Sequence, residues 1–408
     1  MGVATLLRAL GIAVVAAAAF VLVLKVSVAG AYRDSDPARA LKWYPSDADA
    51  KARAAAQIVA ADPAEGRERA IALAQDALAR DPTRVIAVRA LGYAADAGEA
   101  SQWANLLMEK AHWLSRRDQP TQLWLVKEHY RRGDHAGMVR HFDIASRTSD
   151  RSWVQLFPIM IAATADPRVH AQIARTLSEK PNWWRDFVAE LVSKGPELPL
   201  VVSLVRDRLD PDVPEERAII VTLLQRLTNA REFGLAWSVY SEAVGMPAAS
   251  RESLVRDGGF EAASALAPFE WSLGHDPDLA AARQVRGDLE SGVVLSLLAS
   301  NGRSGEVARQ LVRLPGGAYR LEADVGQVPQ TMFERPLLKI VCADGISANT
   351  LIALRPNAPS EAVQRIRGNF TVPGGCQWHW LTVQVGGDGP VRDSPPWIDN
   401  VVIRRTSS

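Results

Sequence analysis

The histidines of this chain are the residues best suited to chemistry, and their spacing fits no common hydrolytic motif. They are His112, His129, His135, His141, His170, His275 and His379. None of them forms the i, i+4 arrangement with a glutamate that zinc proteases use, and no Gly-x-Ser-x-Gly turn is present. Carboxylates are plentiful, but nothing in the sequence selects a pair for glycosidic acid and base roles. The sequence therefore identifies no catalytic residue, and we expect a protein that is not an enzyme.

The segment CQWHWLTVQV, from Cys376 to Val385, places two tryptophans beside one of only two cysteines. In a β-strand, alternate side chains share a face, so Trp378 and Trp380 would lie together, opposite the apolar residues of the segment. Sugar rings stack on exposed aromatic faces, whereas a packed seam around a disulfide would use the same residues structurally. The two interpretations stay open: a packed seam, which we favour, and a glycan-stacking face formed by Trp378 and Trp380.

The N-terminal residues form a membrane-targeting segment. An apolar run from Ala9 to Leu24 follows Arg8 and resumes after Lys25. Residues 1–32 are either a signal peptide cleaved near Ala31 or an uncleaved anchor of about 23 residues, long enough to cross the hydrocarbon core. We favour a single-pass anchor in a bacterial inner membrane with the body in the periplasm. A cleaved, soluble periplasmic protein is the alternative, and Arg8 gives the same orientation in both cases.

The two cysteines, Cys342 and Cys376, both lie near the C-terminus. In an exported chain, such a pair is better interpreted as one structural disulfide than as a redox or metal pair, because disulfides persist in oxidising compartments and the spacing is not that of a zinc site. We therefore expect a Cys342–Cys376 bridge.

Length and composition indicate a globular protein of more than one domain. The chain has 408 residues, of which 48% are hydrophobic and 23% charged, so it can build real cores. Its 47 basic and 46 acidic residues give a formal charge of +1. A net charge this close to zero creates no electrostatic field that would attract the phosphate backbone of a nucleic acid. We therefore expect no nucleic-acid partner.

A helical pattern with a 34-residue period runs through the first half of the chain, over residues 45–250. Small and apolar residues recur at matching offsets in three successive units, which we expect to pack between helices: Ala70, Ala74 and Ala77; Ala104, Met108 and Ala111; Met138, Phe142 and Ala145. Beyond residue 150 the register drifts, and about six helical hairpins are expected in total.

That period and those positions resemble the tetratricopeptide repeat (TPR), whose helix pairs use small residues where two helices touch. The resemblance implies a TPR-like solenoid, because no helical hairpin buries its apolar face alone. It also implies a concave face that binds a segment of another protein. Six tryptophans of this region are expected to pack between helices, with one of the adjacent pair Trp183 and Trp184 facing away from the core; the other four are Trp103, Trp113, Trp124 and Trp153.

From residue 256 onward, short β-like runs separated by Gly, Pro, Asn and Asp replace the helical pattern. We expect eight strands, at residues 269–273, 292–299, 307–314, 318–325, 337–343, 349–355, 376–385 and 399–405. Eight short strands over about 150 residues are typical of an antiparallel sandwich.

The segments DGGFE (Asp257–Glu261), LPGGAYRL (Leu314–Leu321) and WIDNVVI resemble the jelly-roll modules related to carbohydrate-binding families. The resemblance covers most of residues 257–404 and implies a β-sandwich jelly roll over residues 256–408. Some relatives hold a structural calcium between the opening Glu and the closing Asp, which here would be Glu261 and Asp399. Calcium requires six or more oxygen ligands, and two carboxylates do not establish a site. We expect no other cofactor.

The predicted fold class is a multidomain α plus β protein: a membrane helix, a TPR-like solenoid and a C-terminal jelly roll. With its LSRRD and LFP segments, the chain resembles membrane-anchored repeat proteins of alphaproteobacteria. We expect a non-enzymatic periplasmic scaffold or assembly factor in envelope or exopolysaccharide biosynthesis or export, whose repeats bind protein and whose sandwich binds polysaccharide. A protein-interaction adaptor whose sandwich has no ligand is the alternative.

Overall fold

The computed structural model describes residues 3–62, 64–98, 101–246, 254–262, 266–287, 292–343 and 350–406; of residues 3–9 and 101 it describes the backbone only. The chain divides into two compact units, Met1–Phe187 and Val188–Ser408. The expected boundary between residues 250 and 256 falls largely outside the described residues. The limits 1–32, 45–250 and 256–408 stay a prediction.

Helix α1 (Val3–Tyr32) contains the apolar segment. Its stretch Leu10–Tyr32 is long and apolar enough to cross a membrane, and almost none of it is buried by other parts of the protein. A cleaved signal sequence has the same properties. Arg8 lies in this helix, but its side chain is outside the described residues. The last turns of α1 pack through Ala29 against Ala40 of α2 (Pro37–Trp43) and Ala50 of the next helix.

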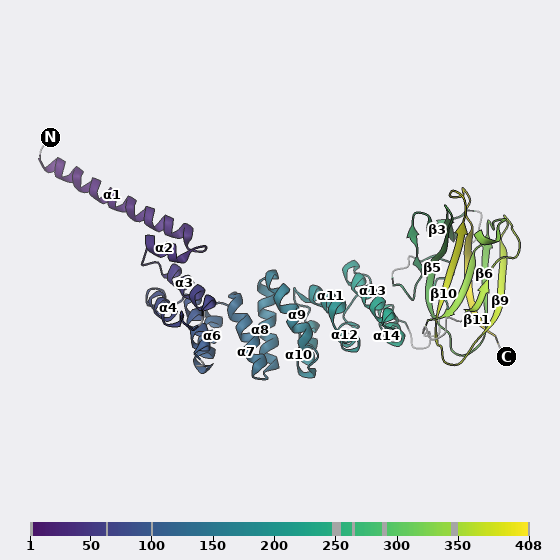
Figure 1. Ribbon diagram of the computed structural model, residues 1–408, viewed down its shortest axis with the longest axis horizontal. Coiled ribbons are helices and arrows are strands. Elements are labelled where there is room, and N and C mark those ends of the chain that lie inside the picture. The colour runs from purple at the N-terminus through teal and green to yellow at the C-terminus, as the bar shows by residue number, and fades with distance from the viewer. Residues whose placement is uncertain are drawn as a thin grey trace. The chain divides into compact units, whose positions relative to one another are not determined.

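The 34-residue period corresponds to a repeat of helix pairs. The outer members α4 (Arg67–Arg80), α6 (Ser101–Leu114) and α8 (His135–Thr148) begin 34 residues apart, at 67, 101 and 135. They alternate with α3 (Ala48–Ala61), α5 (Val85–Ala97) and α7 (Gln119–Arg131). Each pair α3–α4, α5–α6 and α7–α8 packs together, as α7 and α8 do in Figure 1. Helical repeats are therefore present in the first unit.

Aspartates start several of these helices. Asp47 accepts hydrogen bonds from the backbone N–H groups of Asp49 and Ala50 at the start of α3, and Asp118 and Asp134 accept from Thr121 and Gly137 at the starts of α7 and α8. Such N-caps satisfy backbone donors that have no partner within the helix. The Asp-containing breaks in the sequence are therefore helix start signals.

The nine repeat residues occupy the contacts between helices. All nine are buried with no more than 1% of their surface exposed: Ala70, Ala74, Ala77, Ala104, Met108, Ala111, Met138, Phe142 and Ala145. The side chains grow along the chain, from three alanines on α4 to Phe142 on α8. That change fits the aromatic cluster around Phe142, where Phe157, Trp183 and Phe187 meet its ring at centroid distances of 5.0 to 6.1 Å.

The helices after residue 150 are shorter and less regular. They are α9 (Trp153–Ala163), α10 (Pro167–Ser178), α11 (Trp184–Lys194), α12 (Leu198–Val205), α13 (Pro214–Asn229) and α14 (Phe233–Ala243). Among them α13 and α14 pack together, whereas α9 with α10 and α11 with α12 do not pack as closely as the first three pairs. The expected six hairpins stay a prediction. Pro158 inside α9 and the eight-residue α12 fit the drift of the 34-residue register.

The interpretation of the tryptophans was wrong at two points. Trp103 and Trp113 are 65% and 75% exposed, because they lie on the face of α6 opposite Ala104 and Ala111. Trp183 and Trp184 are both buried, although they are adjacent. Trp183 enters the aromatic cluster of Phe142, and the Trp184 ring is covered by the cationic groups of Lys180 and Arg185. Trp184 is therefore buried by cationic side chains that lie over its ring.

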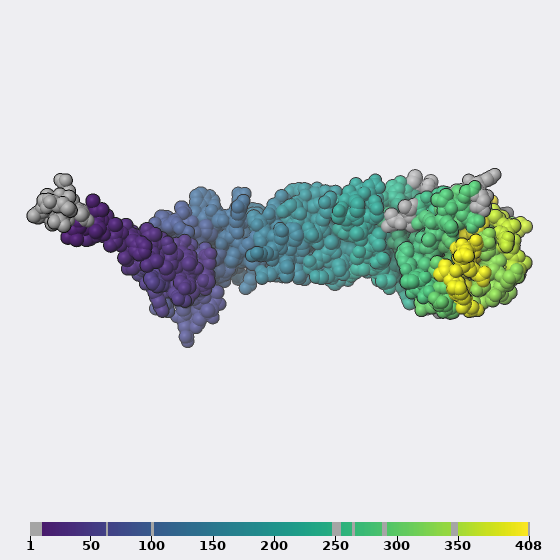
Figure 2. Space-filling model, turned by 90° about the horizontal axis from the view of Figure 1, so that it is seen from above, coloured from purple at the N-terminus to yellow at the C-terminus, as the bar shows by residue number. Residues whose placement is uncertain are grey.

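The C-terminal part is a β-sandwich of two antiparallel sheets with jelly-roll architecture (Figure 1). The first sheet has the order β1-β5-β10-β7-β8 and the second β2-β3-β4-β11-β6-β9. The first sheet contains β1 (Ser272–Leu273), β5 (Arg303–Arg313), β7 (Leu337–Cys342), β8 (Thr350–Leu354) and β10 (Trp378–Gly387). The second contains β2 (His275–Asp276), β3 (Leu279–Val285), β4 (Val293–Ala299), β6 (Gly317–Gly326), β9 (Gln364–Val372) and β11 (Trp397–Arg405). The C-terminal end of the chain, yellow in Figure 2, lies on the surface of this sandwich.

Sequence reasoning missed two long strands. Strand β3 is rich in alanine and shows no β-branched alternation, whereas in β9 Ile366, Phe370 and Val372 alternate with polar residues, a strand signal that sequence reasoning overlooked. The expected strand 269–273 is reduced to Ser272–Leu273, because Phe269 and Trp271 lie in the loop before it. The fold class is nevertheless the predicted one.

The core of the sandwich lies between the two sheets. Leu381, Val383 and Val385 of β10 point into it with Val312 of β5 and Ile340 of β7. His379 shares their face and is completely buried. The apolar side of the CQWHWLTVQV segment is therefore the inner side, as its alternation predicts.

Cys342 and Cys376 form the predicted disulfide. Strand β10 begins at Trp378, so Cys376 lies in the connection before the strand rather than on its tryptophan face. The bridge joins this connection to the end of β7, and it closes a loop of 34 residues. It therefore ties the start of β10 to the end of β7, its neighbour in the first sheet.

Replacing both cysteines by serine is expected to lower the free energy of unfolding by about 2–4 kcal/mol, because the unfolded chain regains the entropy of an open loop. Urea unfolding followed by tryptophan fluorescence measures the change. The unmodified protein in reductant is the matched control and should lose the same amount. An unfolding midpoint that is unchanged in the double variant would contradict this stabilising role.

Candidate functional site

Strand β10 presents Trp378 and Trp380 on the outer face of the first sheet. Trp378 is half-buried, and its ring lies 5.9 Å from Phe269, 6.0 Å from Trp237 and 6.1 Å from Phe233, measured between centroids. Phe233 and Trp237 belong to α14, which is in the same compact unit as the sandwich. Most of the Trp378 ring is thus covered by protein, in line with a packed seam at this residue.

The aromatic cluster continues into the loop before β1. Tyr240 is fully buried, and its ring centroid lies 5.0 Å from that of Phe269. The Arg256 guanidinium stands 5.2 Å from the Tyr240 centroid, and burial raises the pKa of the Tyr240 hydroxyl well above its ordinary value. The phenol therefore stays protonated, 3.4 Å from a Glu270 carboxylate oxygen. The cluster is a structural contact between α14 and the sandwich.

Trp380 has a different environment. It is half-buried, and the Arg309 guanidinium of β5 lies 4.7 Å from its ring centroid. Its cross-strand neighbours are Leu311 and Val341. No aromatic ring of the described residues is recorded against Trp380, so the two tryptophans do not form one continuous platform.

The two carboxylates predicted to hold calcium lie near each other at one end of the sandwich. A Cβ placed on Gly259 would be 3.7 Å from Glu261 Cγ and 3.8 Å from Asp399 Oδ1. Asp399 is buried, whereas Glu261 is exposed. A neighbouring hollow of about 300 Å³ is lined by apolar residues, glycines and Asn400 rather than by these carboxylates. Calcium at this pair stays a prediction.

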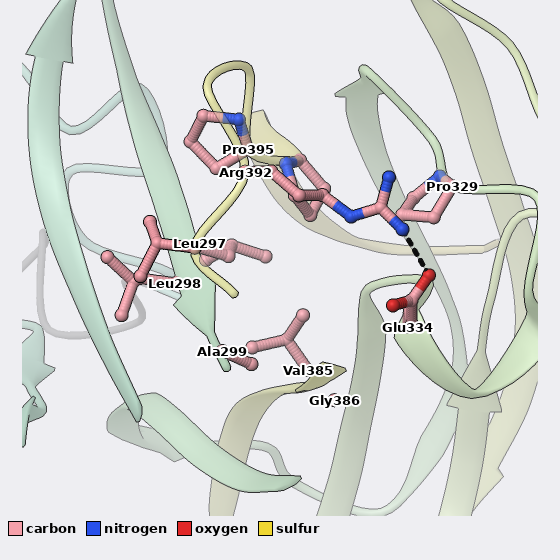
Figure 3. Close-up of a pocket in the computed structure, with 11 residues that line it drawn as sticks. Leu297, Leu298, Ala299, Pro329, Glu334, Val385, Gly386, Arg392 and Pro395 are labelled. Carbon is pink, nitrogen blue, oxygen red and sulfur yellow. Dashed lines mark hydrogen bonds and ion pairs between the residues drawn. The ribbon is translucent and has the colours of Figure 1, made fainter. Parts of the chain in front are cut away.

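A second hollow of the sandwich is too small for a ligand. Figure 3 shows it between β4 and the end of β10, with Arg392 paired to Glu334 at its rim. Its volume is about 10 Å³, enough for a single water molecule. It is a packing defect closed by an ion pair.

A third hollow is a groove in the helical unit. It has a volume of about 510 Å³ and lies between α3, α5 and α7, the inner members of the helix pairs. Its wall is apolar and made of small side chains, with three polar ones along α5: Ala56, Val59, Ala60, Arg89, Tyr93, Asp96, Ala97 and Pro120. A volume of this size accommodates a short peptide or a small ligand.

The polar residues of the groove are held in fixed positions. Arg89 forms an ion pair with Asp118, the N-cap of α7, and both side chains are nearly buried. The Tyr93 hydroxyl donates to the Pro120 carbonyl oxygen over 3.1 Å, and burial raises the pKa of Tyr93. Asp96 accepts a hydrogen bond of 3.0 Å from Trp124 Nε1. These three bonds connect α5 to α7.

Sequence reasoning did not select Arg89, Tyr93 or Asp96. Their spacing of i, i+4 and i+7 places them on one face of α5, and that pattern was readable in the sequence. The predicted sites lie elsewhere: the disulfide pair and the tryptophans are on the sandwich, and the repeat residues are in the helix contacts. The groove among the helical repeats was therefore not predicted.

No family model matches this chain, and no curated protein matches it. Among solved structures, it is similar to a family 4 carbohydrate-binding module, with 16% identity over 37% of this chain and 99% of that chain and a TM-score of 0.28. A family 61 module in complex with β-1,4-galactotriose has 15% identity, covers 38% of this chain and 99% of that chain, and has a TM-score of 0.26. The enzymatically active domain of tailspike protein 4 from bacteriophage CBA120 has 15% identity and a TM-score of 0.28; the match covers 38% of this chain and 22% of that one. Scores this low assign the chain to none of these families.

Burial of His379 predicts a pH-dependent stability. Burial lowers the pKa of His379 to about 4, while the Gln377 backbone opposes the shift. The unfolded chain takes up this proton near pH 6.5, and the folded chain does not until about pH 4, so stability is full above pH 6.5 and falls as the pH drops through that window. The loss at pH 4 is about 3 kcal/mol at most.

Unfolding free energies measured between pH 7 and pH 4 test this dependence. His379→Leu should reduce the slope of the profile, because it removes one titrating group from the core. His275→Gln is the matched control, since His275 is exposed on β2 and should leave the profile unchanged. Equal slopes for the His379 variant and the unmodified chain would show that His379 does not cause the effect.

Proposed function

We propose that this protein is a non-enzymatic scaffold whose helical repeats bind a segment of another protein. The groove between α3, α5 and α7 carries the proposal, because it combines a ligand-sized volume with polar side chains held in fixed positions. The TPR-like assignment of the repeats belongs to this proposal and is supported by their 34-residue spacing.

The chemistry of the groove suits an extended polypeptide. Ala56, Ala60 and Ala97 leave room for a backbone to approach the helices closely. Asp96 uses one oxygen for Trp124, and its remaining lone pairs can accept N–H groups from a bound segment. Arg89 is fixed by Asp118, so its free N–H groups can donate to backbone carbonyls without loss of side-chain entropy.

The proposed location is a bacterial inner membrane, with the protein anchored by α1 and its body in the periplasm. The apolar stretch Leu10–Tyr32 supports an anchor, and the Cys342–Cys376 bridge supports an oxidising compartment. A cleaved form, soluble in the periplasm, is the alternative. In either form, we propose a role in assembling or exporting envelope polysaccharide.

Glycan binding by the sandwich is the second candidate function. Trp380 supports it, because this ring keeps an accessible part, with the Arg309 guanidinium over one of its two faces. Trp378 supports the alternative of a sandwich without a ligand, because α14 covers it. The predicted calcium ligands Glu261 and Asp399 would stabilise this sandwich rather than bind the glycan.

Filling the groove is expected to abolish partner binding. Ala60 is exposed on α3 and lines the groove, so Ala60→Trp should occupy it without disturbing the helix contacts. Proteins that co-purify with the full-length chain from its native cells are quantified for the variant and the unmodified chain. We expect at least a tenfold loss of the partner.

Gln57→Trp is the matched control for this experiment. Gln57 is exposed on the same helix but does not line the groove, so its replacement should leave the partner bound. If the partner is retained by the Ala60 variant, or lost equally from both variants, the groove is not the binding site.

Affinity electrophoresis in gels containing envelope polysaccharides tests the sandwich. Under the glycan proposal, the protein is retarded, Trp380→Ala removes the retardation, and Trp378→Ala affects stability more than retardation. Absence of retardation with every polysaccharide would support the adaptor alternative and overturn glycan binding.

A further inference from the structure

Three imidazoles and a carboxylate meet where α6, α7 and α8 pack together. Glu109 comes from α6, His129 from α7 and His141 from α8. One ligand atom from each of these three residues lies within 4.8 Å of the other two. Residues 20 and 12 positions apart in the chain are thus brought to one point by the stacking of the repeats. The third histidine, His112, stands beside His141 with a centroid distance of 4.8 Å.

His129 is oriented by a carboxylate behind it. Its Nδ1 lies 2.7 Å from Asp134 Oδ2, while Asp134 Oδ1 caps α8 by accepting from the Gly137 N–H. Since the carboxylate can only accept, His129 donates to it from Nδ1, and in the neutral ring the lone pair is then on Nε2. That Nε2 is buried, has no hydrogen-bond partner among the described residues, and lies 3.7 Å from Glu109 Oε1.

Gln122 of α7 orients the other two histidines. Its Oε1 lies 2.9 Å from His141 Nδ1, and its Nε2 lies 3.0 Å from His112 Nδ1. The amide oxygen accepts from His141, which leaves the Nε2 lone pair of His141 available. The amide nitrogen donates to His112, which occupies the Nδ1 lone pair of that ring. Gln122 thus leaves the Nε2 lone pair of His141 available and occupies the Nδ1 lone pair of His112.

The unpaired nitrogen of His129 needs an explanation. A buried imidazole nitrogen without a partner is costly. The sequence also leaves room for the His129 ring. A Cβ on Gly137 would lie 2.2 Å from His129 Nδ1, so only glycine at this position allows the ring to reach Asp134.

We propose that Glu109, His129 and His141 form a binding site for a divalent transition-metal ion of the Zn²⁺ type, with water in the fourth position. Imidazole with one carboxylate suits zinc rather than calcium or magnesium, which prefer oxygen ligands. With metal–ligand bonds of about 2.1 Å, tetrahedral ligand atoms stand about 3.3 Å apart, so small side-chain rotations complete the site. Glu109 is 43% exposed and gives the ion access from solvent.

Carboxylate–histidine and amide–histidine contacts behind metal ligands are the usual second shell of zinc sites. Asp134 and Gln122 supply both kinds here. The ion would join three consecutive helices of the repeat array and stabilise their stacking. This role is separate from the groove, because none of these residues lines it.

Zinc binding is tested on the tag-free, full-length chain in detergent after chelator treatment. Titration with ZnCl₂ in competition with a chromophoric chelator should give one strong site per chain. Glu109→Gln and His141→Gln should each weaken that site at least tenfold. Because Glu109 is partly exposed and glutamine favours helix, its variant should fold as the unmodified chain does, which circular dichroism verifies.

His170→Gln on α10 is the matched control, since it removes a histidine from the same helical region without touching the cluster. It should keep the site at full strength. Substitution with Co²⁺ adds a spectroscopic readout, in which a tetrahedral site gives intense visible absorption that the Glu109 variant reduces. Absence of a strong site, or equal affinity in the Glu109 variant and the unmodified chain, would overturn the proposal.

Discussion

No pair of helices in the repeat region can bury its apolar face by itself, and the first unit depends on this constraint. Each outer helix therefore packs small or apolar residues against its neighbours, from Ala70 on α4 to Phe142 on α8. The stacking sets α3, α5 and α7 side by side and leaves a groove along them. The same stacking brings Glu109, His129 and His141 together from three different helices.

The C-terminal sandwich depends in a similar way on strand β10. Its inner face supplies Leu381 and Val383 to the core, together with His379, a titratable group that must stay neutral there. Its outer face supplies Trp378 to the aromatic cluster with α14. The disulfide fixes the connection that leads into the strand. One strand thus connects the sheet core, the oxidised loop and a helix.

Several elements could be predicted because their signals are local. The 34-residue period located α4, α6 and α8, and the alternation in CQWHWLTVQV gave the inner face of β10. Strand β3 could not be recognised, since its alanines give no strand signal and its stability comes from the neighbouring strands. Strand β9 could have been recognised from the alternation of Ile366, Phe370 and Val372 with polar residues. Trp103 and Trp113 were misplaced although the sequence held a signal: Ala104 and Ala111 mark the packed face of α6, and the two tryptophans lie off that face.

The candidate sites likewise divide into those with a local sequence signal and those that only packing brings together. Arg89, Tyr93 and Asp96 repeat at helical spacing and could have been found by reading one face of α5. The histidine cluster could not, because its members are 12 and 20 residues apart and converge only through helix packing. The position of Glu261 beside Asp399 was predicted from a resemblance, whereas the covering of Trp378 by α14 required the structure.

The central claim is that the inner face of α3, α5 and α7 holds a segment of another protein. Site-specific photo-cross-linking in living cells tests it most directly, with p-benzoylphenylalanine introduced at position 60 and, separately, at position 57. The account predicts a discrete cross-linked protein from position 60 that is absent from position 57 and is diminished by Arg89→Ala. The same adduct from both positions, or none from position 60, would contradict it.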